Sequence, residues 1–222
     1  PQRHFARSAV TRVKICGITD PDAARDAALL GADAIGLNFY EKSPRCIDPS
    51  RASRIIESLP AFVSIVGVFV DYPDPQGLED LALSLGLHAV QLHGNETPDY
   101  CSLIQRVKVI KAFRVDSSFR VESLRSYGST MFLLDSGSGA QFGGTGKVFD
   151  WNQAYGANAF GWIILAGGLT SGNVGEAVSR LHPFGVDVSS GVESSPGKKD
   201  YEKMRRFIET VRRTDVALLG ES

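Results

Sequence analysis

Residues 13–19 have the sequence VKICGIT. The first four form a short, mainly apolar run that ends at Cys16; Gly17 follows at once, and Thr19-Asp20-Pro21 comes soon after. An apolar run of this length, closed by a turn signal, predicts a β-strand. Cys16 would then lie at the carboxyl end of the first strand, where α/β proteins place their chemistry. Residues 132–135, FLLD, repeat the arrangement with Asp135 at the end. A thiol and a carboxylate presented in this way suggest a general base and a general acid.

Seven further apolar runs follow the first, and helix or turn signals separate them. Their starts lie 19 to 31 residues apart, which leaves room for a strand, a helix and two short loops, as parallel βα units require. The eight predicted strands are Arg12–Cys16, Ala34–Asn38, Ser64–Val70, Ala89–His93, Lys108–Ala112, Met131–Asp135, Trp162–Ala166 and Val186–Ser189. Eight such units in just over 200 residues predict an α/β fold, a single (β/α)8 TIM barrel. A doubly wound sheet is the alternative, and it more often has five or six strands.

No linker or low-complexity segment divides the 222 residues. We therefore expect one catalytic barrel domain over residues 13–222, preceded by an N-terminal extension over residues 1–12. Helical patterns fill the intervals between strands, and the last helix is expected over 200–211, with Arg212 and Arg213 at its negative end.

The composition excludes several classes of protein. A net charge of −1 gives no electrostatic basis for binding nucleic acid or an anionic membrane. The longest apolar stretch, residues 61–70, is too short to span a bilayer, and residues 1–12 lack the apolar segment of a secretory signal. Three scattered cysteines without a CxxC pair argue against a zinc site or a disulfide framework. They indicate reduced thiols and a cytoplasmic protein.

Side chains alternate along a strand, so Lys14 and Cys16 face the barrel interior if Val13 and Ile15 face the helices. A single cysteine is more often a small buried hydrophobe than a reactive group, but its place at a strand end favours a functional interpretation. We expect Lys14, one inward position deeper and roughly 7 Å away, to help lower the pKa of the Cys16 thiol.

Other polar residues compete for these roles. Asp135 could simply cap the turn that follows it. Asp187 is a rival acid, but its deeper position favours a buried ion pair with Lys111 or Lys14. His93 is a rival base, although a polar residue at the barrel rim is more often bonded to a loop. Lys111 could form a Schiff base as in barrel aldolases, but no further residue supports that role.

Small residues follow the last two predicted strands and could leave backbone N–H groups free to bind an anion. Barrels commonly bind phosphate at these two loops. The candidate phosphate-binding residues are Gly167, Gly168, Ser189, Ser190 and Gly191. A third glycine-rich loop, residues 143–147 (GGTGK), departs from a Walker A motif because Val148 follows the lysine, and it is interpreted as a flexible lid.

These motifs together closely resemble the phosphoribosylanthranilate isomerase family of tryptophan biosynthesis. The resemblance extends over residues 12–210 and is carried by 14–19 (KICGIT), 31–36 (GADAIG), 43–45 (SPR), 66–70 (VGVFV), 90–94 (VQLHG), 133–135 (LLD), 143–147 (GGTGK), 166–169 (AGGL) and 187–199. Asn38 is a mild departure, since an aliphatic residue is common there in relatives.

The resemblance implies an Amadori rearrangement of a phosphosugar substrate, with Cys16 as general base and Asp135 as general acid. It also implies that Arg45 binds the anthranilate carboxylate, which suits the planar fork of a guanidinium. Without the resemblance, a loop arginine is usually a solvated surface charge. No metal or organic cofactor is expected, because the nitrogen of the substrate acts as the electron sink.

Two other functions remain open at this point. Another phosphosugar barrel, such as an epimerase or the related isomerase of histidine biosynthesis, is one. The histidine enzyme resembles two half-barrels with an aspartate ending strands one and five, where this chain has Cys16 and Ala112. The other is a catalytically silent phosphometabolite-binding protein, which could lose the thiol or the acid. A monomer and a homodimer are both compatible with the sequence.

Overall fold

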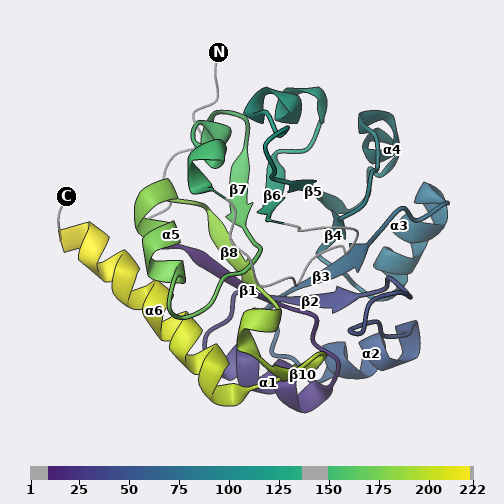
Figure 1. The fold of residues 1–222 in the computed structure, drawn as a ribbon. Helices are drawn as coiled ribbons and strands as arrows, with labels where there is room; N and C mark the ends of the chain where they lie inside the picture. Colours follow the sequence, from purple (N-terminus) through teal and green to yellow (C-terminus); the bar gives the residue numbers. More distant parts are fainter. Residues whose placement is uncertain (1–9, 137–149, 221–222) are drawn as a thin grey trace.

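The computed structural model describes residues 10–136 and 150–220. Within them, eight parallel strands close into a barrel in which each strand pairs with the next along the chain, and β8 pairs with β1 (Figure 1). The strands are β1 (Arg12–Cys16), β2 (Ala34–Asn38), β3 (Ser64–Phe69), β4 (Ala89–Leu92), β5 (Lys108–Arg114), β6 (Met131–Asp135), β7 (Trp162–Leu165) and β8 (Gly185–Val188). The predicted TIM barrel is confirmed, and the predicted strand ends agree to within one or two residues.

Helices and 3₁₀ turns surround the barrel. The α-helices are α1 (Pro21–Leu29), α2 (Pro49–Glu57), α3 (Pro75–Ser84), α4 (Pro98–Leu103), α5 (Val174–Leu181) and α6 (Tyr201–Gly220). The 3₁₀ helices are η1 (Val121–Ser126) after β5, η2 (Trp151–Ala154) and η3 (Ala157–Ala159) before β7, and η4 (Ser190–Val192) after β8. A short hairpin of β9 (Glu193–Ser195) and β10 (Lys198–Lys199) precedes α6.

The first four helices begin with the same local signal, a proline directly after a capping residue. The side chains of Asp20, Asp48, Asp74 and Thr97 each accept a hydrogen bond from a backbone N–H of the first helical turn. Proline suits this first position because its fixed φ is helical and the N–H that it lacks has no partner inside the helix. These caps fix where the loops after β1 to β4 end.

The side chains of the strands divide into two layers. Val13 and Ile15 of β1 are fully buried against the helices, whereas Lys14 points inward and pairs with Asp187 of β8 at 2.8 Å. This confirms both the predicted orientation of β1 and the ion pair suggested for Asp187. A smaller apolar cluster fills the barrel interior, namely Val66, Ala89, Ile110, Ala112, Leu133, Ile164 and Ala166.

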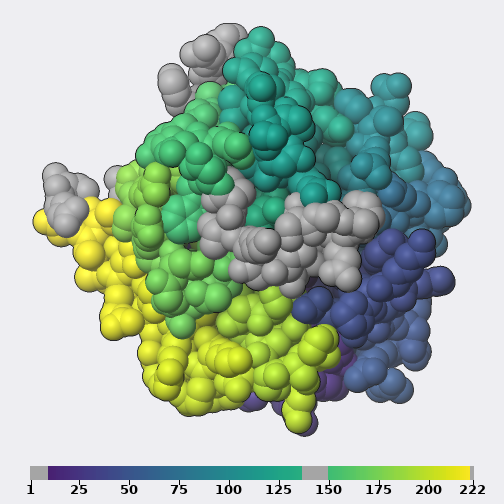
Figure 2. Space-filling view, in the orientation of Figure 1, coloured from purple at the N-terminus to yellow at the C-terminus, as the bar shows by residue number. Residues whose placement is uncertain are grey.

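The C-terminal helix closes the ring of helices. In Figure 2 the yellow and yellow-green C-terminal part of the chain lies beside the purple and blue N-terminal part, with the yellow-green segment adjoining it. Arg212 of α6 donates hydrogen bonds to the Thr11 carbonyl at 2.6 Å and to Asp33 at 2.9 Å. The predicted end of this helix at residue 211 is therefore wrong, because Arg212 anchors the middle of α6 to β1 and the helix runs to Gly220.

The extension expected over residues 1–12 lies mainly outside the described residues. Of its described part, Arg12 belongs to β1, and the Thr11 hydroxyl donates to Asp215 of α6 at 2.7 Å. No helix in the described ranges is both long and apolar enough to cross a membrane.

Candidate active site

A pocket opens at the carboxyl ends of the strands, and every site residue predicted from the sequence lines it. Those residues are Cys16, Arg45, Asp135, Gly167, Gly168, Ser189, Ser190 and Gly191. Further lining residues come from β2, β4 and β8, among them Asn38, Gln91, His93 and Asp187. Six strands thus contribute to one site, which is typical of TIM-barrel enzymes.

Cys16 lies at the carboxyl end of β1 and is only 9% exposed. A Cβ atom at Gly36 of the neighbouring β2 would lie 2.7 Å from its Sγ and 3.1 Å from Lys14 Nζ. Glycine at position 36 therefore makes room for both the thiol and the ammonium group.

The electrostatic surroundings of Cys16 differ in part from the prediction. Burial raises the pKa of the thiol, and the Asp187 carboxylate raises it further, whereas Lys14 lowers it. The predicted effect of Lys14 thus has the right sign but is outweighed. Burial alone would lower the pKa of Lys14, but Asp187 and Cys16 reverse this and raise it to about 12. Lys14 therefore stays protonated beside the thiol.

Asp135 ends β6 and is 6% exposed. Its Oδ2 lies 3.4 Å from Nε2 of His93, and Nδ1 of His93 lies 2.8 Å from Nε2 of Gln91. We assign the Gln91 amide nitrogen as the donor, so that Nδ1 accepts and Nε2 carries a ring proton that faces Asp135. His93, one of the two rival residues, is thus placed to orient the Asp135 carboxyl group. The loop that Asp135 was suggested to cap, and the predicted lid at 143–147, lie outside the described residues.

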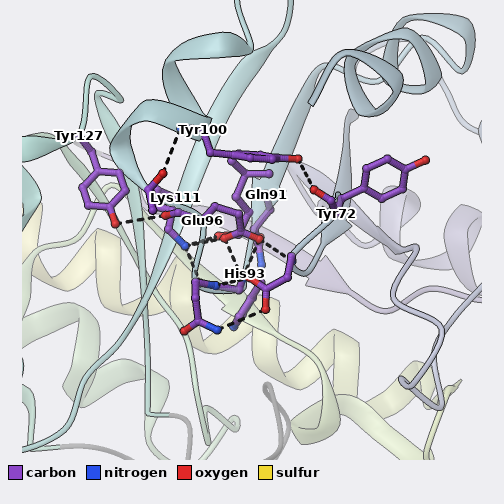
Figure 3. Close-up of polar contacts among 12 residues, drawn as sticks. Tyr72, Gln91, His93, Glu96, Tyr100, Lys111 and Tyr127 are labelled. Carbon is purple, nitrogen blue, oxygen red and sulfur yellow. Dashed lines mark hydrogen bonds and ion pairs between the residues drawn. The ribbon is translucent and has the colours of Figure 1, made fainter. Parts of the chain in front are cut away.

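Lys111 faces away from the barrel interior, unlike Lys14. Its Nζ donates to the carbonyls of Leu92 and Gly94 at 3.2 and 2.8 Å and to the Glu96 carboxylate at 2.8 Å (Figure 3). Glu96 also accepts from the backbone N–H groups of Asp71 and Gly94. The ammonium is fully engaged outside the pocket, which argues against a Schiff-base role, and the network fixes the loop that carries His93.

The loops after β7 and β8 pack tightly against each other. Gly167 and Gly168 have φ angles of +80° and +64°, which favour glycine. A Cβ atom at Gly167 would lie 2.7 Å from Asp135 Oδ1, and one at Gly191 would collide with the Leu169 carbonyl. Glycine at these two positions therefore allows the loops to pack closely against each other and against Asp135.

Asn173 holds the loop after β7 in shape. Its side chain donates to the Gly168 carbonyl at 3.0 Å and accepts from the Thr170 N–H at 2.8 Å. Helix α5 begins directly afterwards at Val174. A helix N-terminus beside glycine-containing loops is an arrangement in which backbone N–H groups can bind an anion.

Arg45 lies in the loop after β2, and its side chain is 13% exposed, so it is not an ordinary solvated arginine. Nε and Nη2 donate to the two carboxylate oxygens of Glu193 at 2.8 and 2.7 Å. The hydroxyl of Ser43 accepts from the Arg45 N–H at 3.1 Å and lies 3.2 Å from the side-chain amide of Asn38. Asn38, the departure noted in the sequence, thus supports the loop that carries Arg45.

Three residues that shape the site were not predicted from the sequence, namely Gln91, Glu193 and Lys199. Lys199 Nζ is fully buried and donates to Glu193 at 2.8 Å. Glu193 and Lys199 stand inside the segment that resembles the family, yet no local pattern pairs either of them with Arg45.

Comparison with known proteins places these features in a family. The model of the family described as N-(5'-phosphoribosyl)anthranilate (PRA) isomerase matches residues 13–210. The N-(5'-phosphoribosyl)anthranilate isomerase of Geobacter sp. strain M21 is 51% identical over 199 residues, covering 90% of this chain and 97% of the relative.

Solved structures agree with this match. Monomers generated from the dimeric phosphoribosylanthranilate isomerase of Thermotoga maritima superpose with a TM-score of 0.79 at 39% identity, covering 91% of this chain and 99% of the other. A phosphoribosylanthranilate isomerase in complex with reduced 1-(o-carboxyphenylamino)-1-deoxyribulose 5-phosphate gives 0.80 at 40% identity, with 92% and 100% covered. The chain belongs to the N-(5'-phosphoribosyl)anthranilate isomerase family.

Proposed function

We propose that this protein converts N-(5'-phosphoribosyl)anthranilate to 1-(2-carboxyphenylamino)-1-deoxyribulose 5-phosphate, an Amadori rearrangement in tryptophan biosynthesis. The observation that carries the proposal is the convergence of Cys16, Asp135 and Arg45 with the two glycine-containing loops on one pocket. Family membership and the related structure in complex with a reduced form of the product support it.

In this mechanism Asp135 and Cys16 each carry out one proton transfer. Asp135, in its protonated form, gives a proton to the ring oxygen of the ribose as the C–O bond breaks. The resulting iminium ion acidifies the C2' proton, which the Cys16 thiolate removes to give an enolamine. Tautomerisation then yields the ketone. Lys14 beside Cys16 favours the thiolate that this step requires.

Binding uses the two charged ends of the substrate. Arg45 takes the anthranilate carboxylate, for which a guanidinium is well suited. The loops after β7 and β8, with Gly167, Gly168, Ser189, Ser190 and Gly191, take the phosphate through backbone N–H groups. Arg45→Ala is expected chiefly to weaken substrate binding, and an unchanged kcat/KM would contradict that role.

We infer a cytoplasmic protein, because the proposed base requires a reduced thiol and none of the three cysteines is in a disulfide. A homodimer or a monomer fits the proposal equally well. A related enzyme is dimeric. Measurement of the mass of this protein in solution would distinguish a homodimer from a monomer.

A fluorescence assay tests the function directly. Substrate is generated in situ from anthranilate, and the loss of its emission is followed with wild type, Cys16→Ser and Asp135→Asn. We expect turnover by wild type and near-complete loss in both variants. Cys46→Ser is the matched control, because Cys46 lies outside the pocket. Folded wild type without turnover would refute the proposal, and active Cys16→Ser or Asp135→Asn would refute that residue's role.

A further inference from the structure

Arg45 stands between the pocket and a buried carboxylate. Arg45 lines the pocket, whereas Glu193, which is 6% exposed, is not among the lining residues. Glu193 takes the Nε and Nη2 edge of Arg45 through two hydrogen bonds of 2.8 and 2.7 Å. Nη1 has no hydrogen-bond partner among the described residues, so the end of the fork formed by Nη1 and Nη2 is left for a second planar carboxylate.

Glu193 is itself firmly held. The buried ammonium of Lys199 donates to its Oε1 at 2.8 Å and to the Ser189 carbonyl at 3.2 Å. Lys203 donates to the Glu193 backbone carbonyl at 2.7 Å. Strand pairing of β9 with β10 places Glu193 opposite Lys199. These contacts therefore hold the Glu193 carboxylate in one position.

The charges in this cluster leave a net attraction for an anion. Burial alone would raise the pKa of Glu193, but the hydrogen bonds and charges of Arg45 and Lys199 outweigh this and lower it, so the group is ionised at neutral pH. The two cations Arg45 and Lys199 then face one carboxylate, and of these three groups only Arg45 lines the pocket. The positive charge of Arg45 therefore suits a substrate carboxylate that approaches from the pocket.

We propose that Glu193, backed by Lys199, is a positioning residue that sets the preference of the pocket for a substrate with a carboxylate on its aromatic ring. Glu193 holds one edge of the Arg45 guanidinium, so the other edge binds the substrate carboxylate without a rearrangement of the Arg45 side chain. The inference rests on the proposed function, which brings the anthranilate carboxylate to Arg45. Glu193 acts through Arg45 and does not touch the substrate.

The test compares two ligands that differ only in that carboxylate. Binding of reduced 1-(o-carboxyphenylamino)-1-deoxyribulose 5-phosphate and of its phenylamino analogue without the carboxyl group is measured by calorimetry. Wild type is expected to prefer the carboxylate about 10- to 100-fold, the range for a hydrogen-bonded charged group. In Glu193→Gln we expect this preference to fall about tenfold, with affinity for the phenylamino analogue unchanged.

The matched control is Glu79→Gln in α3. Glu79 is a buried glutamate that accepts from Arg106 Nε at 2.8 Å but does not line the pocket. It should leave the ligand preference intact. If Glu193→Gln keeps or enlarges the preference, or weakens both ligands equally, the positioning role is overturned while the proposed function stands. Wild type that binds neither ligand and turns over no substrate overturns both.

A measurement on the wild-type protein keeps the inference testable if Glu193→Gln does not fold. The Nε–H resonance of Arg45, assigned by its absence from Arg45→Lys, is followed by nitrogen-15 NMR during titration with the carboxylate ligand. We expect the Nε–H group to remain hydrogen-bonded and its resonance to shift little, because Glu193 stays the acceptor of that group when the ligand binds. A large shift with faster solvent exchange would mean that the ligand displaces Glu193, which contradicts the proposal.

Discussion

The ion pair between Lys111 and Glu96 offers a quantitative test of how the strand-end loops are held (Figure 3). The two side chains are 3% and 2% exposed, so neither charge is solvated. In Lys111→Met the Glu96 carboxylate loses its cation, and in Glu96→Gln the ammonium loses its anion. Removal of one partner from a buried pair typically costs about 3–5 kcal/mol of unfolding free energy.

The structure places each variant within that range. Lys111→Met leaves Glu96 two backbone donors, the N–H groups of Asp71 and Gly94, so a loss near the lower end, about 3 kcal/mol, is expected. Glu96→Gln leaves Lys111 two carbonyl acceptors but no counter-charge, and a similar or larger loss is expected. The double variant leaves no uncompensated charge, so it should cost no more than the larger single loss.

Urea denaturation of the four proteins, followed by circular dichroism, measures these free energies of unfolding. The expected result is a coupling of at least about 3 kcal/mol between the two positions, since the double variant should cost no more than the larger single loss. Losses that add to within about 0.5 kcal/mol would refute the reasoning, since additivity means that the two groups do not compensate each other. The slope of unfolding against urea should stay constant, which confirms that the comparison concerns the native states.

Three further predictions concern the pocket. Asp187→Asn removes a carboxylate that raises the pKa of Cys16, so the rise of kcat/KM with pH should move to lower pH; a move to higher pH would contradict this. Lys14→Met removes a cation that lowers the same pKa, so the profile should move to higher pH, and an unshifted profile would exclude Lys14 as an influence on the base. Gln91→Leu removes the partner of His93 Nδ1, so steady-state kinetics should show kcat falling about tenfold with little change in KM; an effect on KM alone would argue against orientation of the acid.

The barrel could be predicted from the sequence because its signals are local. Each apolar run is short and bounded, and helix starts such as Asp20-Pro21 and Asp48-Pro49 are capping patterns legible in two residues. The end of α6 was missed for the opposite reason. What holds Arg212 in mid-helix is Asp33, 179 residues away in the chain, and no pattern near residue 212 contains that information.

The same distinction applies to the site. Cys16 and Asp135 could be found because each closes its own strand, and topology alone brings strand ends together. Arg45 required the family resemblance. Its contact with Glu193 spans 148 residues and depends on the β9–β10 hairpin, which has only three and two residues per strand and gives no periodic signal.

The raised pKa of Cys16 bears on the order of the proposed steps. A buried thiol beside Asp187 keeps its proton in the free enzyme, so Lys14 alone does not supply a thiolate at neutral pH. Ring opening, in which Asp135 gives up a proton, creates a positive iminium ion and a new negative charge on the acid in the same pocket. In the proposed sequence the Cys16 thiol loses its proton to solvent as the iminium ion forms, because the positive charge of that ion stabilises the thiolate. The iminium ion also acidifies the C2' proton, and a thiolate with a raised pKa is the stronger base to remove it. Proton removal by Cys16 is thereby coupled to ring opening, and burial of the thiol protects it from reaction in the absence of substrate.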